Sequence, residues 1–127
     1  MIELDWHGGK SSFRLRLGEL RALQEKCDAG PMLILDRLRT RVWRVDDVRE
    51  TIRLGLIGAG MPAPEANKLV ELHVDNVPLA ESVMLAHAVL ASALVAPESV
   101  PQGKPQAGET ATEEIRSSSS SSPPSTD

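Results

Sequence analysis

Histidine and cysteine are the side chains of this chain that are best suited to catalysis or metal binding. The three histidines, His7, His73 and His87, are far apart, and none belongs to a His-Glu-x-x-His motif or to a set of Cys and His at zinc-binding spacing. Cys27 is the single cysteine, so neither an intrachain disulfide nor a multi-cysteine metal site is expected. The sequence therefore predicts no metal site and no cofactor site, and it fits a reducing cytoplasm.

A catalytic role is not expected for Cys27 either. It falls at the C-terminal end of a predicted helix, over residues 19–27, where the helix dipole disfavours a thiolate. We interpret Cys27 as a small buried hydrophobe and His87, which lies in an apolar segment, as a core or interface residue. Because no nucleophile is paired with a base, the chain is not expected to be an enzyme.

Gly55, Gly58 and Gly60 form a Gly-x-x-Gly-x-Gly pattern that superficially resembles a phosphate-binding loop. Such loops lie between a strand and the N-terminus of a helix, whereas these glycines come at the end of an amphipathic helical pattern. The glycines therefore predict the end of a helix, with Gly58 or Gly60 supplying its left-handed residue.

The helix that these glycines end is bounded at both ends by local signals. Asp47 is expected to cap its N-terminus, and Glu50, three residues later, is expected to reach back in a capping box. Asp46 and Asp47 are accordingly interpreted as capping residues rather than as a catalytic carboxylate pair. Apolar side chains recur at helical spacing along one face: Val48, Ile52, Leu56 and Ala59.

A basic cluster surrounds Trp43 just before this helix; it contains Arg37, Arg39, Arg41 and Arg44. Arginines around an aromatic ring are typical of nucleic-acid binding, but three aspartates lie in the same segment. Residues 1–96 carry 12 Lys and Arg against 13 Asp and Glu, and the whole chain has a formal net charge of −4. Nucleic-acid binding is therefore not expected, and Trp43 is interpreted as an anchor that packs the connection between two helices onto the core.

The elements that hold these residues begin with a predicted β-hairpin. Apolar residues alternate with polar ones on both sides of a glycine-containing turn at residues 7–10. The apolar positions are Ile2, Leu4 and Trp6 before the turn and Phe13, Leu15 and Leu17 after it. Because a two-stranded ribbon is marginal by itself, its apolar face is expected to pack on helices.

Helical periodicity, with Gly and Pro at the boundaries, predicts about five helices after the hairpin. They cover approximately residues 19–27, 31–40, 47–60, 63–77 and 79–95. The last helix is apolar around most of its circumference and is expected at the centre of the fold, but it is shorter than the roughly 20 apolar residues that span a membrane. The predicted fold is mainly α, an N-terminal β-hairpin packed on a bundle of about five helices.

The composition divides the chain into two parts. Residues 1–96 hold most of the apolar residues and are predicted to form one compact domain. Residues 97–127 are rich in Ser and Pro and are predicted to be a disordered tail. The N-terminal segment has early acidic residues and lacks the layout of a secretory signal, which favours a cytoplasmic location.

Several strings over residues 3–96 occur in an order that resembles one protein family. They are Phe13-Arg14-Leu15 leading into Gly18-Glu19-Leu20-Arg21, Leu23-Gln24-Glu25-Lys26 followed by Ala29-Gly30-Pro31, the stretch from Trp43 to Met61, and, more weakly, Val74-Asp75 with Pro78-Leu79. In this order and spacing the chain resembles the small tail-assembly chaperone-like proteins of gene transfer agents and related long-tailed phages.

The resemblance implies a noncatalytic assembly factor in the cytoplasm of the bacterial producer or host cell. Its expected client is the tape-measure protein, which it would keep soluble while tail tube subunits polymerise; those subunits are a second expected partner, and self-association is left open. The family also carries a tail tube label, so a tail tube or other tail structural subunit is the alternative, although tube subunits are generally β-rich. A small nucleic-acid-binding regulator is the third interpretation.

Three residues are predicted to contact a partner: Trp43, Leu54 and Ile57. Leu54 and Ile57 fall away from the apolar face formed by Val48, Ile52 and Leu56, so this second side is a candidate binding face. Burial of the same two residues within the monomer is the alternative interpretation.

Overall fold

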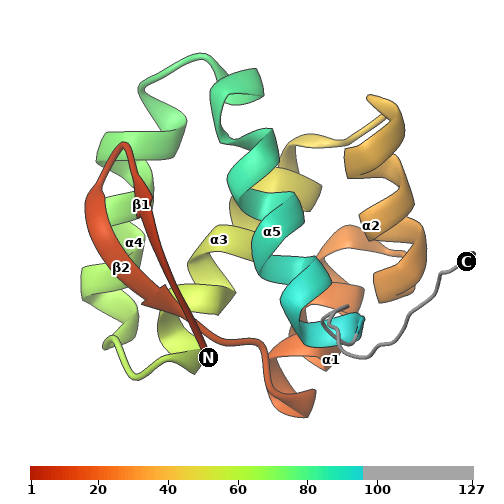
Figure 1. Cartoon of the computed structure of the whole chain (residues 1–127), viewed down its shortest axis with the longest axis horizontal. Coiled ribbons are helices and arrows are strands. Elements are labelled where there is room, and N and C mark those ends of the chain that lie inside the picture. The colour runs from red at the N-terminus through yellow and green to blue at the C-terminus, as the bar shows by residue number, and fades with distance from the viewer. Residues whose placement is uncertain (96–127) are drawn as a thin grey trace, which may run out of the picture. The chain divides into compact units, whose positions relative to one another are not determined.

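A β-hairpin and a set of helices make up residues 1–95, the part of the chain that the computed structural model describes (Figure 1). Strands β1 (Ile2–Trp6) and β2 (Gly9–Phe13) pair antiparallel. The α-helices are α1 (Leu17–Cys27), α2 (Pro31–Thr40), α3 (Val45–Gly58), α4 (Ala63–Val70) and α5 (Val83–Leu94). The predicted mainly α fold with an N-terminal hairpin is therefore confirmed, whereas the predicted tail over residues 97–127 lies outside the described residues.

Strand β2 ends earlier than the alternating pattern suggests. After Phe13, which is fully buried, the backbone N–H of Arg14 donates to the carbonyl oxygen of Gly55 in α3 at 2.9 Å instead of continuing the ladder with β1. Leu15 is still buried, but Leu17 is the first residue of α1 and is 63% exposed. The expectation that Leu17 belongs to the apolar face of the hairpin is therefore wrong, because the chain leaves the ribbon to run along α3.

The N-terminus of α3 is capped three residues earlier than the sequence pattern suggests. Arg44 is the N-cap residue, and its backbone N–H donates to Oδ2 of Asp47 at 2.8 Å. Asp47 is thus the carboxylate that reaches back, not the cap itself, and Glu50 bonds to arginines instead. Only this returning half of a capping box is present, because an arginine side chain has no hydrogen-bond acceptor, and the backbone N–H of Asp47 donates to the backbone carbonyl oxygen of Arg44 at 3.0 Å. The expected assignment of the two members of the box was therefore wrong.

The three glycines of α3 and its C-terminus have different roles. Gly60 has φ +113°, so it supplies the left-handed residue expected after the helix. Gly55 and Gly58 lie inside α3, where a Cβ atom on Gly58 would stand 1.8 Å from the carbonyl oxygen of Arg14. Helix termination therefore explains Gly60, whereas Gly58 forms a notch that admits the backbone leaving β2. Gly55 instead admits side chains, since a Cβ there would stand 2.9 Å from Val89 and 3.2 Å from Phe13.

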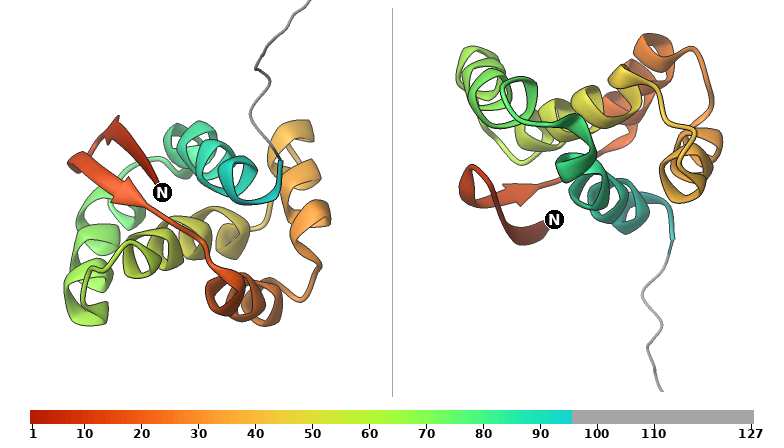
Figure 2. Two further views of the ribbon diagram at one scale, coloured as in Figure 1. Left: turned by 60° about the horizontal axis from the view of Figure 1, so that its bottom comes forward. Right: turned by 90° about the horizontal axis from the view of Figure 1, so that it is seen from above.

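Helix α3, rather than α5, is the central helix of residues 1–95. It contacts β2 and each of the other four α-helices, and Figures 1 and 2 show it lying behind the hairpin and α5. Nine of its residues are buried, against three in α5, where Ala86, Val89 and Leu90 face the core. The expectation that α5 lies at the centre of the fold was wrong. Although α5 is apolar around most of its circumference, only one of its sides is buried in the core.

The segment predicted as one helix over residues 63–77 changes its winding. Helix α4 ends at Val70 and continues as η1 (Glu71–Asp75), a π-helical turn. Val70 and Val74 are both fully buried, so the wider turn keeps its apolar side on the core. A short 3-10 turn, η2 (Leu79–Ser82), then leads into α5, and within residues 1–95 no helix has the length and apolarity needed to cross a membrane.

The Gly58 notch makes a stability prediction. Replacing Gly58 with Ala should lower the free energy of unfolding by about 3 kcal/mol, because the added methyl group would have to displace the backbone at Arg14. Urea or thermal unfolding monitored by circular dichroism measures this change. The matched control is Gly18→Ala in α1, where a Cβ meets nothing within 4 Å; equal destabilisation by both variants would contradict the notch.

Candidate functional site

Cys27 lies in the core at the end of α1. It is 2% exposed, and burial raises the pKa of its thiol to about 12, with the negative charge of Asp47 acting in the same direction. A thiol with this pKa stays protonated near neutral pH and is a poor nucleophile. The interpretation of Cys27 as a buried hydrophobe is confirmed.

Two of the three histidines meet although they are 66 residues apart. His7 in the hairpin turn and His73 in η1 place their Nδ1 atoms 3.0 Å apart, while His87 lies half-buried in α5. No local sequence signal indicates this pair, because it arises only when the hairpin packs against η1. Within residues 1–95, no group of three or more His, Cys, Asp and Glu side chains is placed to hold a metal ion.

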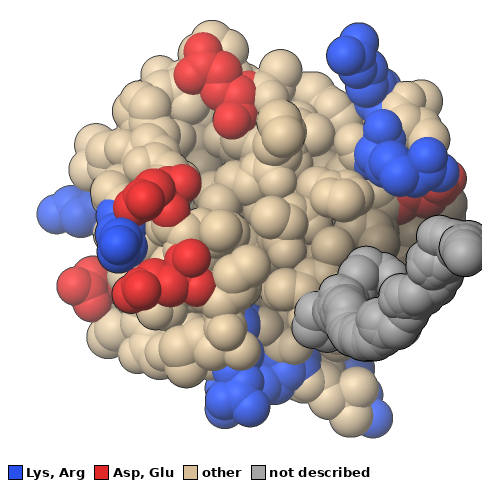
Figure 3. Space-filling view, in the orientation of Figure 1, with Lys and Arg blue, Asp and Glu red and all other residues tan. Residues whose placement is uncertain are grey.

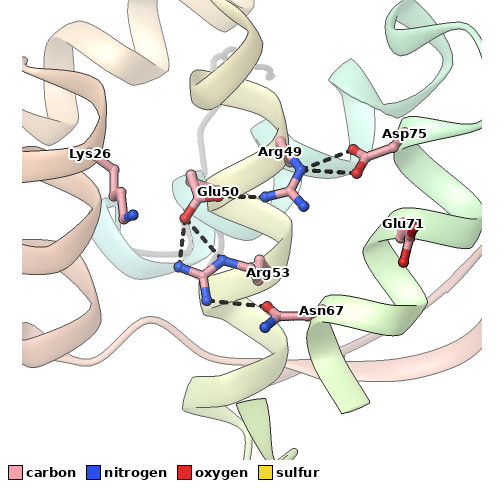
Figure 4. Close-up of a pocket in the computed structure, with 7 residues that line it drawn as sticks. All are labelled: Lys26, Arg49, Glu50, Arg53, Asn67, Glu71 and Asp75. Atoms are coloured by element: carbon pink, nitrogen blue, oxygen red, sulfur yellow. Dashed lines mark hydrogen bonds and ion pairs between the residues drawn. The ribbon is translucent and has the colours of Figure 1, made fainter. Parts of the chain in front are cut away.

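A polar pocket of about 470 Å³ lies between α1, α3 and the α4–η1 segment (Figure 4). At its base is the carboxylate of Glu50, which accepts hydrogen bonds from Nη2 of Arg53 at 2.6 Å and Nη1 of Arg49 at 2.9 Å. Arg49 also donates to Asp75 of η1, with Nε to Oδ1 at 2.9 Å. The network therefore links α3 to the last residue of η1.

Glu50 is the buried member of this network, with 4% of its surface exposed. Burial raises the pKa of Glu50, but the hydrogen bonds and positive charges of Arg53 and Arg49 outweigh it, and the net pKa lies below the ordinary value. Glu50 is thus ionised and fully engaged near neutral pH. Because Glu50, Arg49 and Arg53 bond to one another, the network has a structural explanation.

Trp43 lies in the connection between α2 and α3, partly buried against the core, which confirms its interpretation as an anchor. Its exposed side lines a second pocket, of about 390 Å³, together with Arg41, Ala80, Val83 and Met84. Met84, at the start of α5, is 84% exposed. The pocket thus joins the α2–α3 connection to the first turn of α5, a contact that the sequence pattern did not predict.

The arginines near Trp43 bond largely to their own chain. Arg37 pairs with the buried Asp47, Nη1 to Oδ1 at 3.5 Å, and Arg39 pairs with Asp36. The guanidinium of Arg44 donates to the carbonyl oxygen of Cys27 at 3.3 Å. These contacts reduce the positive charge that the cluster presents to a phosphate backbone.

The other two predicted contact residues lie in different environments. Leu54 is 6% exposed and belongs to the core, so the sequence-based proposal that it faces a partner is replaced by the burial alternative. The reason is that α3 is covered on several sides, which leaves no free second face at Leu54. Ile57 is partly buried and packs against the same core.

The Glu50 network makes a prediction with a pH dependence. Glu50→Gln should lower the free energy of unfolding by about 2 kcal/mol near neutral pH, because two arginines lose a buried charged partner. Since the folded-state pKa of Glu50 is lowered, its contribution is full above the unfolded-state pKa of about 4.3 and is lost as the pH falls through the folded-state pKa.

Urea titrations of the unmodified protein and the Glu50→Gln variant, from neutral pH to about pH 3, test this account. The difference between their free energies of unfolding should become smaller at acidic pH. Glu71→Gln is the matched control, because Glu71 lines the same pocket outside the bonded network shown in Figure 4. A difference in unfolding free energy that stays constant with pH, or that is as large for Glu71→Gln, would contradict this account.

Comparison with known proteins identifies the family. A family model described as "Phage tail tube protein, GTA-gp10" matches residues 1–95, which confirms the resemblance noted in the sequence. No curated protein and no solved structure gives a match. Because the family model covers the hairpin and every described helix, the chain belongs to the GTA-gp10 family of phage tail tube proteins.

Proposed function

We propose that the protein is a noncatalytic tail assembly chaperone that binds the tape-measure protein of a gene transfer agent or prophage. Membership of a phage tail family supports a role in tail formation. The observation that carries the proposal is an exposed apolar surface, the α5 face, defined as the outer side of α5 with the pocket at Trp43. The protein acts in the cytoplasm of the producing cell, before or during tail polymerisation.

The α5 face has no charge along its helix. None of the residues of α5 is Asp, Glu, Lys or Arg. Figure 3 shows this side of the molecule in the orientation of Figure 1, with charged side chains at the margins and none across the middle. An uncharged face that exposes a large apolar side chain, here Met84, is typical of a protein interaction site.

The pocket at Trp43 gives this face an anchor point. Met84 is an exposed large hydrophobic residue, and it lines the pocket together with Trp43 and Val83. Arg41 is the one charged residue among the side chains that line this pocket. The matching client segment is an amphipathic helix with an apolar stripe for the pocket and a carboxylate beside it for Arg41.

A tail tube subunit is the alternative, and the description of the family as tail tube proteins favours it. The described fold supports the chaperone proposal instead, because residues 1–95 contain one two-stranded ribbon and are otherwise mostly helical. A tube subunit stays in the particle, whereas a chaperone leaves it. The two functions therefore differ in where the protein is found after assembly.

Coexpression with the tape-measure protein encoded near the tail genes tests the proposal. We expect the two proteins to copurify, the tape-measure protein to become more soluble, and finished particles to lack this chain by mass spectrometry. Presence of the chain in particles at a stoichiometry like that of the tube would support the tail tube alternative. Failure to copurify would overturn the chaperone proposal.

The α5 face makes a mutational prediction. Met84→Glu should weaken binding of the tape-measure protein by about tenfold or more, because it places a charge in the apolar pocket, while the thermal unfolding midpoint stays close to that of the unmodified protein. Biolayer interferometry and thermal scans measure the two effects.

Leu72→Glu is the matched control, since Leu72 is also exposed but belongs to η1 and does not line this pocket. Equal loss of binding in both variants would reject the α5 face as the client site. Size-exclusion chromatography with light scattering distinguishes a second copy of the chain as the occupant, because Met84→Glu would then convert an oligomer to a monomer.

A further inference from the structure

We propose that His7 and His73 form a two-histidine site for a late first-row divalent cation such as Zn²⁺, linking the hairpin turn to η1. The observation behind it is the approach of their Nδ1 atoms to 3.0 Å. The site is separate from the α5 face, so it stands or falls independently of the chaperone function.

The separation of the two nitrogens suits two adjacent ligands on one metal ion. With Zn–N bonds of about 2.0–2.1 Å, nitrogens 3.0 Å apart subtend an angle of about 91–97° at the metal. Increasing the distance between the two nitrogens by about 0.3 Å gives the tetrahedral angle at the metal. The two rings are tilted by 53° to one another, so they are not stacked face to face.

The hairpin side of the site is held in place by its own packing. His7 and Gly8 form the turn between Trp6 and Gly9, and Nε1 of Trp6 donates to Oγ of Ser11 at 2.9 Å. A Cβ on Gly8 would stand 3.0 Å from Leu69 in α4, so the turn lies directly on that helix. The position of His7 is thus set by contacts other than the histidine pair.

The opposite side is held by the π-helical turn. Val70 and Val74 are fully buried on either side of His73, and the edge of Trp6 meets the His73 ring at a centroid distance of 6.0 Å. π-Helical turns inside a helix are frequent at functional sites. Here the altered winding is the local feature that accompanies the placement of His73 against the hairpin.

The surrounding charges favour a cation. His7 lines a pocket of about 210 Å³ together with Asp5 and Glu81, although within residues 1–95 neither acidic residue is placed as a third ligand beside the histidine pair. The facing nitrogens form one hydrogen bond, in which one ring donates and the other accepts, whereas a divalent cation accepts a lone pair from each ring. Water completes the coordination, because His7 is exposed.

Isothermal titration of the full, tag-free chain with ZnCl₂ tests the proposal. We expect one Zn²⁺ per chain, an increase in thermal midpoint on binding, and weaker binding at acidic pH as protons compete for the imidazoles. MgCl₂ should not bind, because Mg²⁺ prefers oxygen ligands. His7→Gln and His73→Gln should each weaken Zn²⁺ binding about tenfold or more.

His87→Gln is the matched control, because His87 lies in α5 and is not part of the pair. It should bind Zn²⁺ like the unmodified chain. Circular dichroism of the metal-free variants shows whether a loss reflects unfolding, and Zn²⁺-induced shifts of the His7 and His73 ring protons in NMR spectra of the unmodified chain provide a readout that needs no variant. Absence of Zn²⁺ binding, or binding that survives both substitutions, would overturn the proposal.

Discussion

The close packing of the chain at Arg14 against α3 is the contact on which the arrangement of the other elements depends. The backbone reaches the helix at Gly55 and Gly58, donates one hydrogen bond to Gly55, and leaves no space for a Cβ on Gly58. This approach brings the apolar face of the hairpin onto α3 and directs the chain into α1. Because α3 is also covered by α2, α4 and α5, it serves as the common surface for the rest of the described fold.

Buried charge and exposed apolar surface divide the roles of α3 and α5. Helix α3 buries two carboxylates, those of Asp47 and Glu50. Asp47 pairs with Arg37 of α2, and Glu50 pairs with two arginines of α3, one of which also pairs with Asp75 of η1. Pairs of this kind restrict how neighbouring helices sit, since a misplaced partner would leave a charge unpaired. Helix α5 has no charged residues, so its inner side packs on the core without ion pairs and its outer side is uncharged.

The hairpin, the helices and their approximate limits were predictable because each has a local signal. Alternation marks the ribbon, Gly30-Pro31 separates α1 from α2, and the apolar spacing of Val48, Ile52 and Leu56 marks the buried side of α3. Trp43 was recognised as an anchor from its position between charged residues and a helix. The capping pair was misassigned, since any of several residues near Asp47 has a plausible local partner and only the backbone geometry selects Arg44.

By itself, the sequence determined the fold class, the family, the burial of Cys27 and the uncharged character of α5, since these follow from composition, periodicity and the order of motifs. Only the tertiary structure decided that Gly58 is a point of close approach, that Leu54 is buried, and that His7 meets His73. The physical reason is that these three properties depend on which segment packs opposite each residue. Periodicity places a side chain on one face of its own helix, but the identity of the neighbour across that face is set by the packing of distant parts of the chain.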